Sequence, residues 1–158
     1  MRSARRFATM LVATALMTSS LAACGGESEA EAEKEKIGAG AAADLSTCRG
    51  DAKAAAAPYG DGFPTGWAFP PRTVVFNAED RGADGTIVSA VSSSSFKEIL
   101  DFLNHDVVGA GFKIEKGETE DHDAEAEWKG NGFHGRWAIR ESAPCSGETV
   151  IQVLSAAD

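Results

Sequence analysis

The densest run of residues able to bind a metal ion lies at residues 115–127, where acidic side chains surround one histidine. Carboxylate oxygens are the ligands that Ca²⁺ prefers, and an imidazole suits a transition metal. One hypothesis therefore places a metal at Glu120, Asp121, His122 and Asp123. The spacing lacks the fixed glycine and final glutamate of a calcium-binding loop, and alternate residues of a strand point to opposite faces. We favour the alternative, a solvated acidic loop.

The three histidines, His105, His122 and His134, are the residues best suited to proton transfer near neutral pH. A small hydrolase that uses His122 or His134 with nearby carboxylates is one hypothesis. However, the chain has no Gly-x-Ser-x-Gly turn around a nucleophilic serine, and its glycines show no phosphate-loop spacing. We therefore assign no catalytic residue, expect no cofactor, and favour a non-enzymatic binding or interaction module.

The first residues have the layout of a secretory signal. Arg2, Arg5 and Arg6 make a basic start, residues 7–17 are mostly apolar, and small residues then lead to Cys24. The apolar stretch is too short and too interrupted for a helix that spans a membrane. Residues 1–23 are therefore expected to be a signal peptide.

The sequence Leu21-Ala22-Ala23-Cys24 resembles the lipobox that ends the signal peptides of bacterial lipoproteins, and two glycines follow it. The resemblance implies cleavage before Cys24, a diacylglycerol on its thiol, and anchoring at the extracytoplasmic face of the cell membrane. Two acyl chains are enough for stable anchoring. A plain secretory signal with an unrelated cysteine is the alternative. By its Ala- and Gly-rich bias, the chain also resembles small uncharacterised lipoproteins of actinobacteria, which implies no activity.

Two further cysteines bear on the redox compartment. If lipid occupies Cys24, then Cys48 and Cys145 remain as a pair in an oxidising compartment. We expect a Cys48–Cys145 disulfide, which would close a loop of about 97 residues and contribute roughly 4–5 kcal/mol in the chain-entropy model. Two free buried thiols are the alternative.

The charge of the mature chain limits its partners. Removal of residues 1–23 leaves 135 of the 158 residues. It takes away three of the 15 basic residues and none of the 24 acidic ones, so the net charge becomes −12 with His neutral. This charge argues against nucleic acid as a partner. The partners expected are the membrane, through the lipid, and an envelope protein or a small ligand. Residues 24–45 are expected to be a flexible acidic and Ala/Gly-rich tether.

Residues 46–71 form a separate segment that is expected to pack on the core. Its Ala-rich part, residues 46–57, is expected to form a short helix that a proline ends. The rest is rich in Gly, Pro and aromatic residues. Tyr59, Phe63 and Trp67 either pack across the domain or line a ligand groove, and we favour packing.

Residues 72–158 are expected to form the folded domain. Patterns of apolar residues predict strands at 73–78, 86–92, 112–116 and 149–154, and a hairpin over residues 124–140. Ser95 and Glu98 match the capping box of a helix whose apolar stripe is Phe96, Ile99, Leu100, Leu103 and Val107. The predicted class is α+β with the order ββαβββ, a mostly antiparallel sheet with one helix packed on one face.

The best-defined element is the hairpin around Asn131-Gly132, a pair that favours a two-residue type I′ turn. The turn fixes a register in which large residues oppose small ones: Trp128 opposite Gly135, Ala126 opposite Trp137, and Ala124 opposite Ile139. On the other face, opposite charges meet: Glu127 opposite Arg136, and Asp123 opposite Arg140. The apolar face is therefore expected to lie under the helix and the charged face to be solvated.

Overall fold

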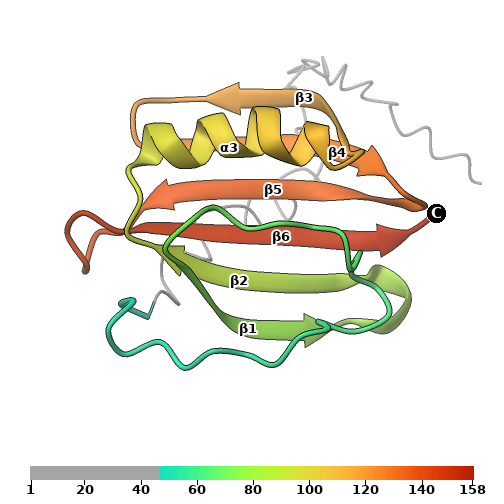
Figure 1. The fold of residues 1–158 in the computed structure, drawn as a ribbon, viewed down its shortest axis with the longest axis horizontal. Helices are drawn as coiled ribbons and strands as arrows, with labels where there is room; N and C mark the ends of the chain where they lie inside the picture. The colour runs from blue at the N-terminus through green and yellow to red at the C-terminus, as the bar shows by residue number, and fades with distance from the viewer. Residues whose placement is uncertain (1–46) are drawn as a thin grey trace, which may run out of the picture.

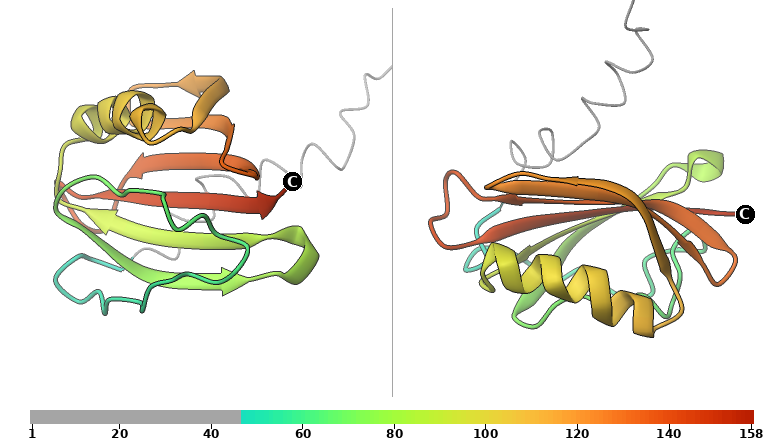
Figure 2. Two further views of the ribbon diagram at one scale, coloured as in Figure 1. Left: turned by 45° about the vertical axis from the view of Figure 1, so that its right-hand side comes forward. Right: turned by 90° about the horizontal axis from the view of Figure 1, so that it is seen from above.

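A six-stranded sheet, antiparallel throughout, is the frame of residues 47–158, the part of the chain that the computed structural model describes (Figure 1). One α-helix crosses this sheet, and the views in Figure 2 place it on a single side. The predicted class, α+β with a helix on one face, is confirmed. The expected signal peptide (residues 1–23), the lipidated Cys24 and the tether (residues 24–45) lie outside the described residues and stay predictions.

The sheet consists of β1 (Thr73–Asp80), β2 (Thr86–Ser92), β3 (Lys113–Thr119), β4 (Asp123–Gly130), β5 (Phe133–Glu141) and β6 (Thr149–Ala157). The helix α3 (Phe96–Gly109) lies between β2 and β3, and the 3-10 helix η1 (Gly82–Asp84) joins β1 to β2. The strands lie side by side in the order β1-β2-β6-β5-β4-β3. The expected order ββαβββ is wrong by one strand. Four strands follow the helix, because the hairpin around Asn131-Gly132 contributes two.

The last strand, β6, returns from the β3 edge to the middle of the sheet. After α3, the strands β3 to β6 run as a meander in which each strand pairs with the next. The meander brings β6 back beside β2, and the two pair from Thr86–Ser155 to Ser92–Thr149. As a result, β2, β6, β5 and β4 are internal strands, and β1 and β3 form the two edges.

The helix α3 begins at the predicted capping box. The Ser95 hydroxyl accepts a hydrogen bond from the Glu98 backbone N–H at 3.3 Å, and the Glu98 carboxylate accepts one from the Ser95 N–H at 2.8 Å. The buried stripe of the helix is Ile99, Leu103 and Val107, at the spacing of one helical face. No helix in the described part of the chain is long and apolar enough to cross a membrane.

The hairpin of β4 and β5 has the predicted register. The cross-strand pairs Trp128–Gly135, Ala126–Trp137 and Ala124–Ile139 are all present. Asn131 and Gly132 both have positive φ, 56° and 80°, as a type I′ turn requires. The turn chemistry and the alternation of large and small residues therefore specify the same pairing.

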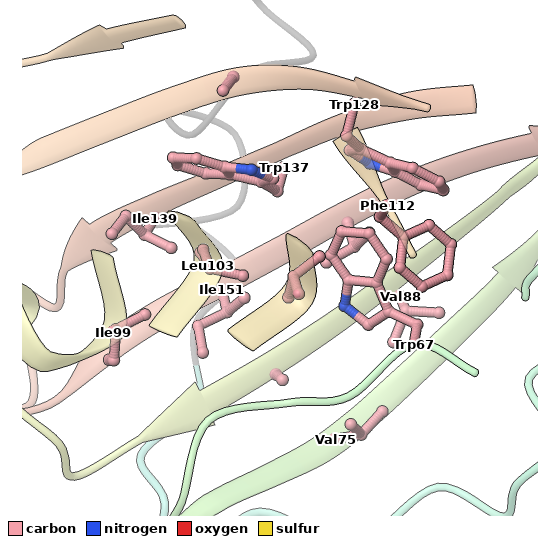
Figure 3. Close-up of a cluster of buried hydrophobic side chains, with 14 of the residues drawn as sticks. Trp67, Val75, Val88, Ile99, Leu103, Phe112, Trp128, Trp137, Ile139 and Ile151 are labelled. Atoms are coloured by element: carbon pink, nitrogen blue, oxygen red, sulfur yellow. The ribbon is translucent and has the colours of Figure 1, made fainter. Parts of the chain in front are cut away.

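The core lies between α3 and one face of the sheet (Figure 3). Trp128 and Trp137 are each 1% exposed and project from neighbouring strands toward the helix. Trp67, from the segment before β1, packs on Trp128 with the ring centroids 4.5 Å apart and on Phe112 with the centroids 5.1 Å apart. This aromatic cluster and α3 together cover one face of the sheet.

The short helix expected over residues 46–57 is wrong in the part that the structure describes. Residues 47–57 form a turn at Arg49–Asp51 and an otherwise irregular chain. The Ala55 N–H donates to the Val75 carbonyl of the edge strand β1 at 2.8 Å, so the segment is attached to the sheet instead. An isolated helix shorter than about 12 residues is marginal even in Ala-rich sequences, so one tertiary contact of this kind can override it.

Cys48 and Cys145 form the predicted disulfide, with their Cα atoms 5.6 Å apart. Cys145 lies in the loop between β5 and β6, so the bond attaches the start of the described chain to that end of the sheet. The Arg49 N–H also donates to the Glu148 carboxylate at 2.8 Å. Because the two cysteines are 97 residues apart in sequence, the crosslink stabilises the fold by about 4–5 kcal/mol in the chain-entropy model.

The pairing of Trp128 with Gly135 gives a stability prediction. A Cβ at Gly135 would overlap the Leu154 carbonyl oxygen and lie 3.0 Å from Cζ2 of Trp128. Gly135→Ala should therefore lower the free energy of unfolding by about 1–3 kcal/mol, measured by urea unfolding followed through Trp fluorescence. Gly66→Ala is the matched control, because a Cβ there has no atom within 4 Å. Equal midpoints for the two variants would contradict this packing.

Candidate functional site

The acidic residues proposed as metal ligands do not converge. The Glu120 N–H donates to the Asp123 carbonyl at 2.8 Å, which closes the turn before β4. The side chain of His122 contacts the Glu141 carboxylate at 2.9 Å, and that of Asp123 binds Arg140 at 2.6 Å. Within residues 47–158, the only close group of three metal-ligand atoms is Cys48, Cys145 and Glu148, and its two sulfurs are bonded to each other. This arrangement favours the solvated-loop interpretation of residues 120–123.

The three histidines lie at three separate places. His105 is on α3 beside Asp101, His122 precedes β4 beside Glu141, and His134 begins β5 beside Asp158. Their side chains are 74%, 77% and 58% exposed. His134 and the carboxylate partner of His122 lie at opposite ends of the same strand. The hydrolase hypothesis, which needs a histidine and carboxylates gathered in a cleft, gains no support from this geometry.

The aromatic residues proposed as a ligand groove pack into the core. Phe63 and Trp67 are only 4% and 6% exposed. Tyr59 is partly buried and contacts Phe63 edge-on, with the ring centroids 5.7 Å apart. These contacts agree with the packing role, because they leave little ring surface for a ligand.

A groove of about 480 Å³ lies on the other face of the sheet, which we call the open face because α3 is on the opposite side. Its floor has apolar side chains from three internal strands, with Ile87 from β2, Ala138 from β5 and Leu154 from β6. Around them lie longer polar and charged side chains: Glu115, Glu127, Lys129, His134, Arg136 and Gln152. We call this feature the open-face groove.

The strand register explains why these residues meet. Ile87 pairs with Leu154, Leu154 pairs with Arg136, and Arg136 pairs with Glu127, so one row crosses four strands. Successive side chains of a strand point to opposite faces, so this row lies opposite the row that carries Trp128 and Val88. The floor is recessed, because Ile87 and Ala138 are only 4% and 5% exposed.

The groove was not predicted from the sequence. The charged outer positions of the hairpin were identified, but two of the three apolar floor residues, Ile87 and Leu154, belong to β2 and β6 and lie 67 positions apart in the sequence. A signal was present nonetheless: the outward positions Ile87 and Leu154 are apolar, although alternation alone would make them polar. Only the return of β6 to the side of β2 brings these positions together.

The cations at the groove are already paired with carboxylates. Lys129 Nζ lies 2.6 Å from a Glu115 carboxylate oxygen, which lowers the pKa of Glu115 and raises the pKa of Lys129. His134 contacts Asp158 at 2.9 Å. Arg136 binds Glu125, its diagonal neighbour on β4. Glu127 lies directly opposite Arg136 in the strand register but forms no ion pair with it.

Arg136 is the most enclosed of these cations, with a side chain that is 31% exposed. Its burial lowers the pKa of the guanidinium, and the charge of nearby Glu118 opposes that shift. Glu127 is exposed, and no ion pair involves it among the residues that the structure describes. The charge that remains free at the groove is therefore negative.

The groove combines an apolar floor with a charged rim. An apolar floor can take an apolar body, and rim charges can orient a polar head, which is the usual plan of a small-molecule site. No known protein family, no curated protein and no solved structure matches the chain.

The pairing of Glu115 with Lys129 predicts a titration. In a ¹³C NMR titration, the Glu115 carboxyl should have a midpoint below its ordinary value of 4.5, because the Lys129 ammonium donates to it. The pKa of Glu115 is lower in the folded state than in the unfolded state, so the ionised pair stabilises the fold above the unfolded-state pKa. This stabilisation is lost as the pH falls through the folded-state pKa.

Lys129→Ala should move the Glu115 midpoint upward. Lys113→Ala is the matched control and should move it less, because the Lys113 ammonium is 3.5 Å away and lowers the pKa of Glu115 less. A larger shift in the Lys113 variant would show that the pair is assigned to the wrong lysine.

Proposed function

We propose that this chain is a lipid-anchored, extracytoplasmic binding module that holds a ligand with an apolar body in the open-face groove. The observation that carries the proposal is the recessed apolar floor of Ile87, Ala138 and Leu154 on a sheet face that the helix does not cover. A sheet face that contacts only solvent carries polar side chains at its outward positions, so a recessed apolar patch on such a face indicates a ligand-binding site.

Two features support the location. The lipobox-like sequence at Leu21–Cys24 implies a lipid anchor on Cys24. The disulfide between the other two cysteines fits an oxidising compartment, because such bonds are rare where thiols are kept reduced. The proposal joins these features: Cys24 carries lipid, and Cys48 and Cys145 stabilise the domain outside the cell.

The position of the groove suits a tethered binding module. Most of the groove lies near one end of the strands, with Ile87 near the start of β2, His134 near the start of β5 and Leu154 near the end of β6. The disulfide, where the chain enters the domain, is in the β5–β6 loop at the opposite end (Figure 1). A domain held from its disulfide end would present the groove away from the membrane.

The anchor is tested by Cys24→Ala. This variant should lose the acyl mass that the wild-type protein carries, and it should move from the membrane fraction to the soluble fraction of cells. Ala23→Gly is the matched control and should stay in the membrane fraction, because a small residue is kept at that position. Membrane retention of the alanine variant, with no acyl mass on the wild type, would refute the anchor.

The groove is tested with an uncharged probe, a decyl glycoside below its micelle concentration. Amide NMR shifts should change at Ala138, Gln152 and Leu154, and Leu154→Ser should weaken binding by several-fold because it removes apolar area from the floor. Lys97→Ser, on the exposed side of α3, is the control and should leave the affinity unchanged. Shifts confined to the helix side, or none at all, would contradict a ligand role for the groove.

A further inference from the structure

The free charges around the open-face groove indicate which polar group a ligand would carry. Lys129, Arg136 and His134 each have a carboxylate partner, Glu115, Glu125 and Asp158 respectively. In contrast, Glu127 lines the groove and has no ion-pair partner in the described part of the chain. A cationic ligand can therefore bind a free carboxylate without breaking an existing pair.

Glu118 does not line the groove but adds a negative charge close to it. It pairs with Glu125 across β3 and β4, in the row next to that of Glu127, and its charge acts on Arg136. Adjacent carboxylates on one face repel each other, and a bound cation would relieve that repulsion.

An anionic ligand would have to break an existing ion pair. Its carboxylate or phosphate would have to displace Glu115 from Lys129 or Glu125 from Arg136 before it could pair with a cation. The whole domain adds to this cost, because residues 47–158 carry 10 Lys and Arg against 18 Asp and Glu, a net charge of −8 with His neutral. The electrostatics thus select against anions both at the groove and at long range.

The size of the groove limits the ligand further. A volume of about 480 Å³ lies within the range of small-molecule sites, roughly 300–1,000 Å³. Leu154 of the apolar floor lies directly beside Arg136 in the row that crosses the strands. Glu127 is the next residue of that row, on the other side of Arg136. The apolar part and the charged part of the site are therefore side by side, as an amphiphilic molecule requires.

We infer that the ligand of the open-face groove is a small amphiphilic cation, an apolar body that carries an ammonium or guanidinium group. The apolar body lies over Ile87, Ala138 and Leu154, and the cationic group binds Glu127 with support from Glu118. This inference rests on the proposed function, because it names the ligand class of the same groove.

The experiment compares three probes with the same alkyl chain: decylamine, decanoate and the uncharged decyl glycoside, each below its micelle concentration, on the full-length protein. Affinities are measured by NMR titration of the groove amides at low ionic strength. Decylamine should bind about tenfold more tightly than decanoate, with the glycoside between them. Added salt should reduce the difference, because the carboxylates are exposed.

Glu127→Gln tests the role of the carboxylate. It should weaken the binding of decylamine by about two- to fivefold, the usual range for an exposed ion pair, and should change the binding of the uncharged glycoside less. Asp101→Asn, on the helix side of the sheet, is the matched control and should change neither. Because Glu127 is exposed, the variant is expected to fold, which an unchanged midpoint of thermal unfolding would confirm.

The two proposals fail in different ways. Glycoside binding in the groove with no preference for decylamine would overturn the cationic ligand and leave the binding groove standing. Tighter binding of decanoate than of decylamine would also overturn the cationic ligand. A basic peptide of alternating Lys and Leu that binds the groove while decylamine does not would replace the small ligand by a polypeptide. Absence of binding by all three alkyl probes would remove the groove itself.

Discussion

The structure depends on one constraint: a six-stranded sheet has two faces, and the described chain supplies one α-helix. That helix and the aromatic segment before β1 cover a single face, where Trp67, Trp128 and Phe112 form the closest-packed cluster (Figure 3). Apolar residues that point the other way have no helix to pack on. Ile87 and Leu154 are such residues, and the open-face groove is the consequence.

The same register produces both the core and the groove. In the β4–β5 hairpin, Gly135 leaves room for the indole of Trp128 on the core face. The next positions along the strands, Arg136 and Glu127, then have to point to the open face. A slip of one residue would exchange the two faces and destroy both features together. The Asn131-Gly132 turn, which fixes this register, is therefore as important to the site as any residue that lines it.

Local signals in the sequence predicted the elements that depend on nearby residues. The capping box at Ser95, the type I′ turn at Asn131-Gly132 and the Cys48–Cys145 disulfide are all present. The short helix over residues 46–57 failed because a contact with β1 outweighs helix propensity. The groove could not be predicted, since it depends on β6 lying beside β2, a long-range pairing that no local pattern encodes. The acidic run at residues 115–127 suggested a metal site, but the side chains of His122 and Asp123 contact Glu141 and Arg140 of β5, so residues 120–123 do not converge on one point.

If the open face, rather than the helix face, meets the ligand in the cell, the two faces should differ in what they contact there. Photo-crosslinking in intact cells tests it most directly, with a photoreactive amino acid placed at Gln152, on the groove, or at Lys97, on the exposed side of α3. We expect an adduct of one defined added mass from position 152 and none from position 97. Equal adducts from both positions, or an adduct from position 97 alone, would contradict it.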